Sequence, residues 1–133
     1  MRFTDKLRRL GVFCASRRDL RIARNRFALH DLVQIHHVIP RFCALHPTVR
    51  TLQYDIDGPS NFVIMPTHRG VRELRLRPDR LVHDGGHMAY CSHVWDRLYE
   101  VEDEEQLLEL VATLHRGMRR TDASIPWRTQ SIS

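Results

Sequence analysis

Two short apolar runs, each followed by a proline, most restrict how this chain can fold. The first, LVQIHHVI, covers residues 32–39 and precedes Pro40; the second, NFVIM, covers residues 61–65 and precedes Pro66. β-Branched and apolar residues favour strands, and a proline cannot donate a ladder hydrogen bond. The pattern therefore predicts two short strands that pair as a hairpin, with a long loop between them.

Helical patterns flank this hairpin. Ser16 and Asp19 resemble a capping box at the start of a basic helix. An acidic run at 102–105 precedes an apolar stripe, and acidic residues stabilise a helix N-terminus. The stretch 67–80 is basic and is expected to be a loop. The predicted helices span residues 4–10, 17–28, 83–99 and 102–117.

Basic charge is concentrated at the N-terminus. The chain has 133 residues and a net charge of +5, while residues 1–41 alone carry ten basic and three acidic residues, a balance of +7. Such a segment is typical of a protein that binds a polyanion, although a solvated helix surface gives the same pattern. The sequence contains no run of 18 uncharged apolar residues, so no membrane span is predicted. The N-terminus lacks the apolar core of a signal peptide. An intracellular protein, in the cytoplasm or nucleus of a host cell or in a virion, is expected.

Three cysteines, Cys14, Cys43 and Cys91, are an odd number at irregular spacing. This favours free thiols in a reducing compartment over a disulfide framework. Cys43 with His46, and Cys91 with His93, could be half-sites for a structural zinc. Buried thiols are the preferred interpretation.

Histidines carry the strongest chemical signal. His36 and His37 are adjacent at the end of the first predicted strand, where a buried strand would favour valine or isoleucine. His83 and His87 are four residues apart, so a helix would place them on one face, where two imidazoles can bind one cation. Hydrolysis of nucleic acid needs a base to activate water and a cation to stabilise developing charge. Neutral imidazole suits the first task, since its ordinary pKa lies near neutral pH.

Three sequence blocks occur in an order and spacing that resemble one nuclease superfamily. The blocks HHVIP, DGPSNFVIMP and HDGGHMAY are similar to the HNH/endonuclease VII, or ββα-metal (His-Me finger), nucleases, and more narrowly to their AHH branch. The second block includes the Asp-x-x-x-Asn approach to the second strand. The resemblance covers residues 36–98 and implies a two-stranded hairpin and a helix that together bind a metal ion.

The resemblance also implies roles for individual residues. His37 corresponds to the general base that activates water, and His36 to a metal ligand. Asn61 corresponds to the central asparagine, which braces the loop or orients the base. His83 and His87 correspond to metal ligands on the helix.

Some positions depart from the family pattern or have weaker roles. Ile35 stands where the family has the alanine that precedes the histidine pair, a position that does no chemistry. Gly85 and Gly86 would delay the helix start, which makes His87 a safer ligand than His83. Tyr90 falls at an aromatic position that is expected to serve packing. Two arginines, Arg41 and Arg72, are candidates for contacts with nucleic acid.

The expected fold class is α+β, with a small ββα-metal finger embedded in a helical frame. A single nuclease-like domain would cover residues 1–120. It would contain a basic helical segment over 1–31, the finger over 32–99 and a last helix over 102–117. Residues 121–133 would form a flexible tail.

The predicted activity is that of a metal-dependent endonuclease that hydrolyses phosphodiester bonds. Its partner is nucleic acid, with double-stranded DNA favoured over RNA, and its cofactor is one divalent metal ion, Zn²⁺ or Mg²⁺ with Ni²⁺ and Mn²⁺ as alternatives. Two other interpretations remain open: a non-catalytic nucleic-acid or chromatin-binding protein that uses the finger as a metal-stabilised scaffold, and a zinc-stabilised interaction module.

Adjacent strand residues point to opposite faces, so one site can use both His36 and His37 only if the strand twists, bulges or ends there. The backbone is therefore predicted to leave regular strand geometry at residues 36–37.

Overall fold

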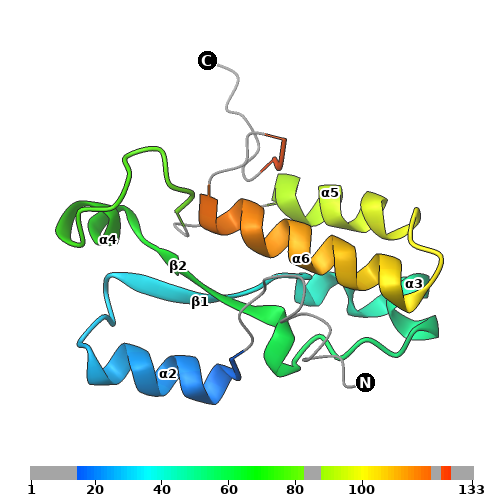
Figure 1. Ribbon diagram of the computed structural model, residues 1–133, viewed down its shortest axis with the longest axis horizontal. Helices are drawn as coiled ribbons and strands as arrows, with labels where there is room; N and C mark the ends of the chain where they lie inside the picture. The colour runs from blue at the N-terminus through cyan, green and yellow to red at the C-terminus, as the bar shows by residue number, and fades with distance from the viewer. Residues whose placement is uncertain (1–14, 83–87, 121–123, 127–133) are drawn as a thin grey trace.

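The computed structural model describes residues 15–82, 88–120 and 124–126. Within these ranges a two-stranded sheet is surrounded by helices (Figure 1). The α+β class expected from the sequence is confirmed. In chain order the elements are α2 (Arg17–Arg26), β1 (Val33–His37), η1 (Arg41–Leu45), α3 (Pro47–Thr51), η2 (Pro59–Asn61), β2 (Phe62–Pro66), α4 (His68–Glu73), α5 (Met88–Leu98) and α6 (Glu104–Arg120).

The hairpin forms where the two apolar runs predict it. Strands β1 and β2 pair antiparallel, with Val33 opposite Pro66 at one end and His37 opposite Phe62 at the other. Successive side chains alternate between the two faces of the sheet. A continuous register therefore assigns each strand residue to one face.

The two faces of the hairpin pack against different helices. On one face Ile35, Phe62 and Ile64 pack with Leu20 of α2, whose helix begins at the Ser16 cap that the sequence predicts. On the other face Val63 and Met65 enter the main core. Figure 1 shows α2 below the hairpin and the pair of α5 and α6 above it.

Helices α5 and α6 supply most of the main core. Their buried apolar side chains include Tyr90, Val94, Leu98, Leu107, Leu108, Val111 and Leu114. The start of α6 is capped, because Asp103 accepts a hydrogen bond from the Gln106 amide at 2.8 Å and the Gln106 side chain accepts one from the Glu102 amide at 2.8 Å. The predicted helix at 102–117 is thus present, shifted slightly along the chain.

The segment between the strands is more ordered than the predicted long loop. It contains η1, α3 and η2. His46 is fully buried and caps α3, since its Nδ1 accepts a hydrogen bond from the Thr48 amide at 3.1 Å. The ring also packs against Trp95 and Tyr99 of α5, with centroid distances of 4.6 and 4.3 Å. His46 therefore ties this segment to the helical layer.

The expectation of a loop throughout 67–80 was wrong for residues 68–73, which form α4. The Thr67 hydroxyl caps this short helix by accepting a hydrogen bond from the Gly70 amide at 3.0 Å. Gly70 lies so close to β1 that an added Cβ would be 1.9 Å from the Leu32 carbonyl oxygen. A polar cap and close tertiary packing, rather than an apolar stripe, produce this helix.

Near the C-terminus, Ile125 is buried and packs into the main core. The rest of the predicted tail lies almost entirely outside the described residues, as does the predicted helix at 4–10. Among the helices that the structure describes, none has the length and apolar character needed to cross a membrane.

Candidate active site

His36 and His37 lie at the end of β1 in regular strand geometry. His36 pairs with Val63, and His37 with Phe62, in the same register as the rest of the hairpin. The prediction that the backbone departs from strand geometry at 36–37 was therefore wrong. The strand instead ends immediately after His37.

The two imidazoles have different surroundings, as the alternation of a strand requires. The His36 side chain is buried and its ring lies 5.8 Å from that of Tyr90 in α5. The His37 ring packs on its cross-strand neighbour Phe62, with 4.7 Å between centroids. Both residues nevertheless line one cavity of about 300 Å³ at the strand end, together with Arg41, Phe42 and Cys91.

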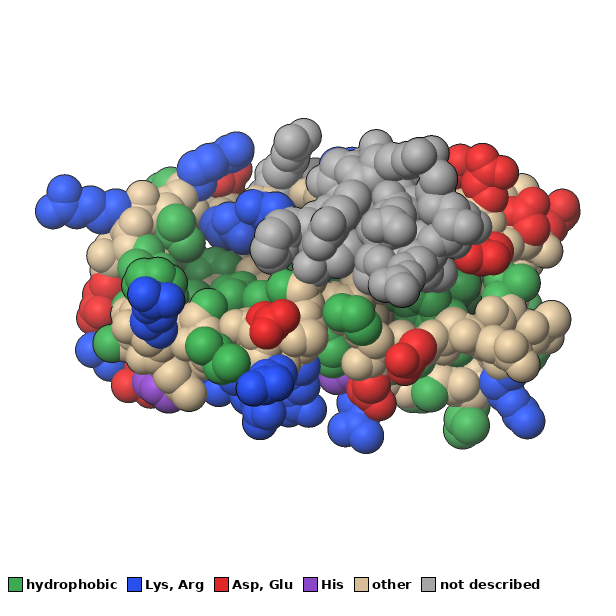
Figure 2. Space-filling model, turned by 60° about the horizontal axis from the view of Figure 1, so that its bottom comes forward, with side chains coloured by type: hydrophobic (Ala, Val, Ile, Leu, Met, Phe, Trp, Pro, Cys, Tyr) green, Lys and Arg blue, Asp and Glu red, His purple; other side chains and the backbone are tan. Residues whose placement is uncertain are grey.

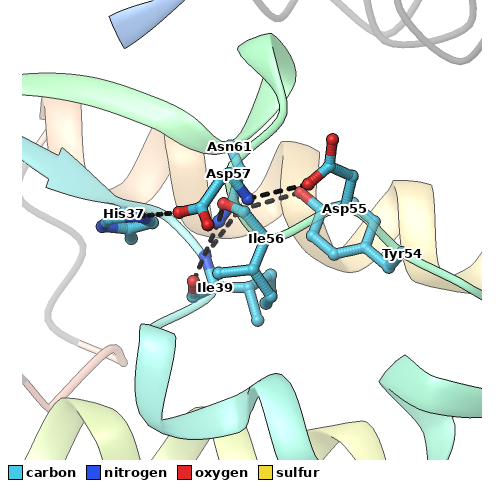
Figure 3. Close-up of polar contacts among 7 residues, drawn as sticks. All are labelled: His37, Ile39, Tyr54, Asp55, Ile56, Asp57 and Asn61. Carbon is cyan, nitrogen blue, oxygen red and sulfur yellow. Dashed lines mark hydrogen bonds and ion pairs between the residues drawn. The ribbon is translucent and has the colours of Figure 1, made fainter.

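His37 forms a hydrogen bond with a carboxylate (Figure 3). Its Nε2 lies 3.0 Å from Oδ1 of Asp57 in the segment before β2. The side chain of His37 is 16% exposed and that of Asp57 is 68% exposed, so the pair lies at the protein surface rather than in the core. The hydrogen bond from His37 lowers the pKa of Asp57, and the charges of Arg41 and Arg17 lower it further.

The local turn fixes where Asp57 lies. The Asp57 amide donates to the Asp55 side chain at 3.1 Å, which is an Asx-type turn, and the Gly58 amide donates to the Asp55 carbonyl at 3.0 Å. A Cβ at Gly58 would lie 3.1 Å from the Asp55 carbonyl oxygen, so the turn is tightly closed. The turn thereby holds the Asp57 carboxylate toward the end of β1.

Asn61 connects this turn to the end of β1. Its side chain is fully buried, with Oδ1 accepting from the Ile39 amide and the Tyr54 hydroxyl, each at 2.8 Å. Its Nδ2 donates to the carbonyls of Ile39 at 2.9 Å and Ile56 at 2.7 Å. Figure 3 shows the amide between the segment that carries Asp57 and the segment after His37.

Tyr90 supports the same strand end from the helical layer. Its fully buried hydroxyl donates a hydrogen bond to the Val38 carbonyl. Burial raises the pKa of Tyr90 well above its usual value, so the phenol stays protonated and remains a donor. The expected packing role of this aromatic position fits these contacts.

The metal-ligand prediction is only partly covered by the described residues. His36 lines the cavity, whereas His83 and His87 lie outside the described ranges. Within those ranges no group of three or more His, Cys, Asp or Glu side chains is arranged to hold a metal ion. The residues present still fit a metal ion, because His36 brings an imidazole to the cavity. Helix α5, which starts at Met88, contacts the His36 ring through Tyr90.

Among the described residues, Cys43 and Cys91 belong to no group of three or more potential metal ligands. Cys43 and Cys91 are free, buried thiols, and Cys14 lies outside the described residues. Burial raises the pKa of Cys43 to about 12, with Cys91 as a second cause. Burial therefore keeps the Cys43 thiol protonated at neutral pH in the metal-free protein.

The two candidate arginines lie in different places. Arg41 is exposed and lines the cavity of His36 and His37. Arg72 is exposed on α4 and lines a separate cavity with His68 and Arg80. Only Arg41 therefore lies next to the histidine pair.

Sequence reasoning assigned no role to Asp57 and Arg17. Asp57 begins the Asp-x-x-x-Asn approach to β2, a motif that does not by itself give the carboxylate a role. No local signal marks Arg17, whose proximity to Asp57 depends on how α2 packs against the hairpin. A motif position was thus a usable signal for Asp57, and only the tertiary structure identifies Arg17.

The antiparallel hairpin, the helix that packs on its histidine and the histidine pair at the strand end together define a small ββα nuclease domain. The family model of the AHH nucleases, described as a nuclease family of the HNH/ENDO VII superfamily with conserved AHH, matches residues 19–116. The chain belongs to this family. Comparison with curated proteins and with solved structures gave no match.

The family assignment makes Ile35 informative, because it stands at the alanine position of the conserved motif. Ile35 is partly buried and packs against the small cluster of Leu20 and Phe62. The larger side chain fills space between the sheet and α2, on the face opposite His36. Ile35 also lines the cavity of the histidine pair, so the departure from the motif contributes a larger apolar side chain to the wall of that cavity.

Proposed function

We propose that this nuclease is a metal-dependent endonuclease in which His37 is the general base that activates water. The observation that carries the proposal is the hydrogen bond of 3.0 Å between His37 Nε2 and the Asp57 carboxylate at a cavity that His36 also lines. A carboxylate that orients a histidine base, beside a further imidazole, is an arrangement suited to phosphodiester hydrolysis.

The protonation of the pair follows from hydrogen-bond chemistry. An ionised carboxylate only accepts hydrogen bonds, so Nε2 of His37 carries the proton that Asp57 receives. The lowered pKa of Asp57 keeps this carboxylate ionised at neutral pH. Nδ1 of His37 is then the unprotonated nitrogen, and it takes the proton from the attacking water. General-base catalysis of this kind contributes about 10²–10⁴ in rate.

Asn61 is proposed as a positioning residue rather than as a group that touches substrate. Three of its hydrogen bonds join the backbone of Ile39, just past the histidine pair, to the backbone of Ile56, just before Asp57. Losing these bonds would separate the base from the carboxylate that orients it. Of the two roles of the family's central asparagine, bracing the loop therefore has stronger support than orienting the base directly.

The divalent metal would be held by His36 together with His83 and His87. When bound, it would stabilise the negative charge that develops on the phosphate and on the leaving oxygen. Three imidazoles favour Zn²⁺ or Ni²⁺, while the superfamily also uses Mg²⁺, and Mn²⁺ is a further alternative. His36 is buried against Tyr90, which fixes its ring for this task.

Double-stranded DNA is the proposed substrate, and an intracellular location is proposed with it. Arg41 lines the cavity, and both Arg41 and Arg17 lie close enough to lower the pKa of Asp57. These cations, with Arg72 as a more distant contact, would bind backbone phosphates. Affinity should then fall steeply with salt and depend little on base sequence.

A plasmid-nicking assay tests the proposal. Wild-type protein should nick DNA with a divalent cation and lose the activity with a chelator. His37→Ala should lose about 10²–10⁴ in rate, while His30→Ala, at an exposed turn, should retain it. DNA binding without cleavage under every divalent cation would instead favour the non-catalytic DNA-binding alternative.

A further inference from the structure

A second cavity lies along β2 and is separate from that of the histidine pair. It has a volume of about 410 Å³ and an apolar wall that includes Leu20 and Phe62. Two arginines, Arg80 and Arg119, and one histidine, His115, also line the cavity. None of its described lining residues is acidic. Figure 2 shows a hollow with hydrophobic side chains inside it and Lys or Arg side chains along its rim.

Arg80 is partly buried and has one buried donor without a partner. Its Nε is buried and has no hydrogen-bond partner among the described residues. Burial lowers the pKa of Arg80, and the charge of Arg119 lowers it further. A guanidinium nevertheless stays protonated, so two cations converge here at a cost in free energy. An anion in the cavity would remove that cost.

Three other arginines of the described residues are paired with carboxylates. Nε of Arg69 lies 2.7 Å from Oε1 of Glu73, and Nη1 of Arg97 lies 2.7 Å from Oε2 of Glu100. Arg77, three residues before Arg80, lies 2.9 Å from Asp79. The Asp79 carboxylate is therefore paired with the exposed Arg77. Arg80 instead lines a cavity that has no acidic residue among its described lining residues.

His115 adds a neutral polar group to the same cavity. It is 4% exposed, and burial lowers its pKa to about 4, with Arg119 as the next cause. At neutral pH the imidazole therefore carries one N–H donor and no charge. A phosphate accepts hydrogen bonds from both guanidinium and imidazole donors, and its charge matches the two arginines.

Phe62 links this cavity to the histidine pair. It lines the second cavity, and its ring lies 4.7 Å from that of His37. A nucleic-acid strand cut beside His37 carries further phosphates on each side of the scissile one. Through Phe62 the second cavity is adjacent to the strand end that carries His37.

We propose that the cavity of Arg80, His115 and Arg119 binds a non-scissile phosphate of the substrate strand. The choice of a nucleic-acid phosphate as the ligand rests on the proposed nuclease function. The cavity alone does not distinguish the two, because the oxygens of inorganic phosphate accept hydrogen bonds from the same side chains. It assigns Arg80 and Arg119 to substrate binding and leaves the chemical step to His37.

Titration of the protein with inorganic phosphate, followed by thermal unfolding, tests the cavity independently of cleavage. Phosphate should raise the melting temperature of wild-type protein, and Arg80→Gln and Arg119→Gln should each need about tenfold more phosphate for the same effect. Arg97→Gln, an exposed ion-paired position on α5, is the matched control and should respond like wild type. Unchanged phosphate dependence in both variants would overturn the anion site.

Binding of a short DNA duplex in the presence of chelator tests the source of the phosphate. Arg80→Gln should weaken binding about tenfold and reduce the slope of log affinity against log salt by about one, and in cleavage it should raise KM with kcat unchanged. Arg119→Gln gives a second reading should Arg80→Gln fail to fold. Phosphate binding with unaltered DNA affinity would overturn the strand assignment. Because the phosphate titration and the duplex-binding measurement do not require cleavage, an inactive wild type would count against the nuclease proposal alone.

Discussion

Replacing Asn61 by alanine should destabilise the protein more than most single substitutions do. The Asn61 side chain is fully buried and forms four hydrogen bonds of 2.7–2.9 Å. Truncation leaves the Ile39 amide, the carbonyls of Ile39 and Ile56, and the Tyr54 hydroxyl without this partner. The variant therefore tests whether the asparagine is a structural brace as well as a requirement for activity.

The magnitude follows from the groups left behind. A buried donor or acceptor that loses its partner costs about 1–3 kcal/mol, and partial rescue by water reduces the sum for four of them. We expect a loss of about 3–5 kcal/mol in the free energy of unfolding, against a total of about 5–15 kcal/mol for a domain. Asn61→Asp keeps the acceptor but removes both donors, so it should also be destabilising.

Urea unfolding followed by circular dichroism provides the measurement, and the nicking assay is run on the same preparations. Asn25→Ala, at an exposed position of α2, is the matched control and should stay within about 0.5 kcal/mol of wild type. His37→Ala should lose activity while retaining most of its stability. A loss below about 1 kcal/mol in Asn61→Ala would refute the bracing role.

Three further predictions concern packing, pH and the thiols. Gly70→Ala should destabilise the protein by about 1–3 kcal/mol in urea unfolding, because its Cβ would lie 1.9 Å from the Leu32 carbonyl oxygen; wild-type stability would contradict this. The pKa of His115 falls to about 4, so the unfolded state binds the proton first on acidification, and stability should fall by up to about 3 kcal/mol between about pH 6.5 and 4. In phosphate-free buffer His115→Gln should show a smaller fall, and an unchanged pH dependence would exclude His115 as its source. With the other cysteine replaced by serine, Cys43 and Cys91 should react with a thiol reagent only upon unfolding, since both are buried; rapid labelling of the native protein would contradict this.

Local sequence patterns were enough to predict the hairpin and the main helices. Apolar runs bounded by Pro40 and Pro66 marked both strands, and the Ser16 cap marked α2. These signals are local, because strand preference, capping and proline punctuation act over a few residues. The helix α4 was missed because it depends on the Thr67 cap and on the close approach of Gly70 to the Leu32 carbonyl, which is a tertiary contact.

The candidate site shows the same division. Motif order was sufficient to select His36, His37 and Asn61, but not to show how His37 is held. Its partner Asp57 is positioned by a turn and by the Asn61 brace, and the proximity of Arg17 arises from the packing of α2. The mistaken expectation of irregular backbone at 36–37 assumed that both rings must point the same way. They instead line one cavity because the strand ends at His37.

The central proposal is that His37, oriented by Asp57, activates water for phosphodiester cleavage. The most direct measurement is single-turnover cleavage of a plasmid by wild type, His37→Ala and Asp57→Asn, each with a divalent cation and with a chelator. Wild type should cleave only with the cation, His37→Ala should lose about 10²–10⁴ in rate, and Asp57→Asn should be slowed with DNA affinity unchanged. Cleavage at the wild-type rate by His37→Ala would contradict the proposal.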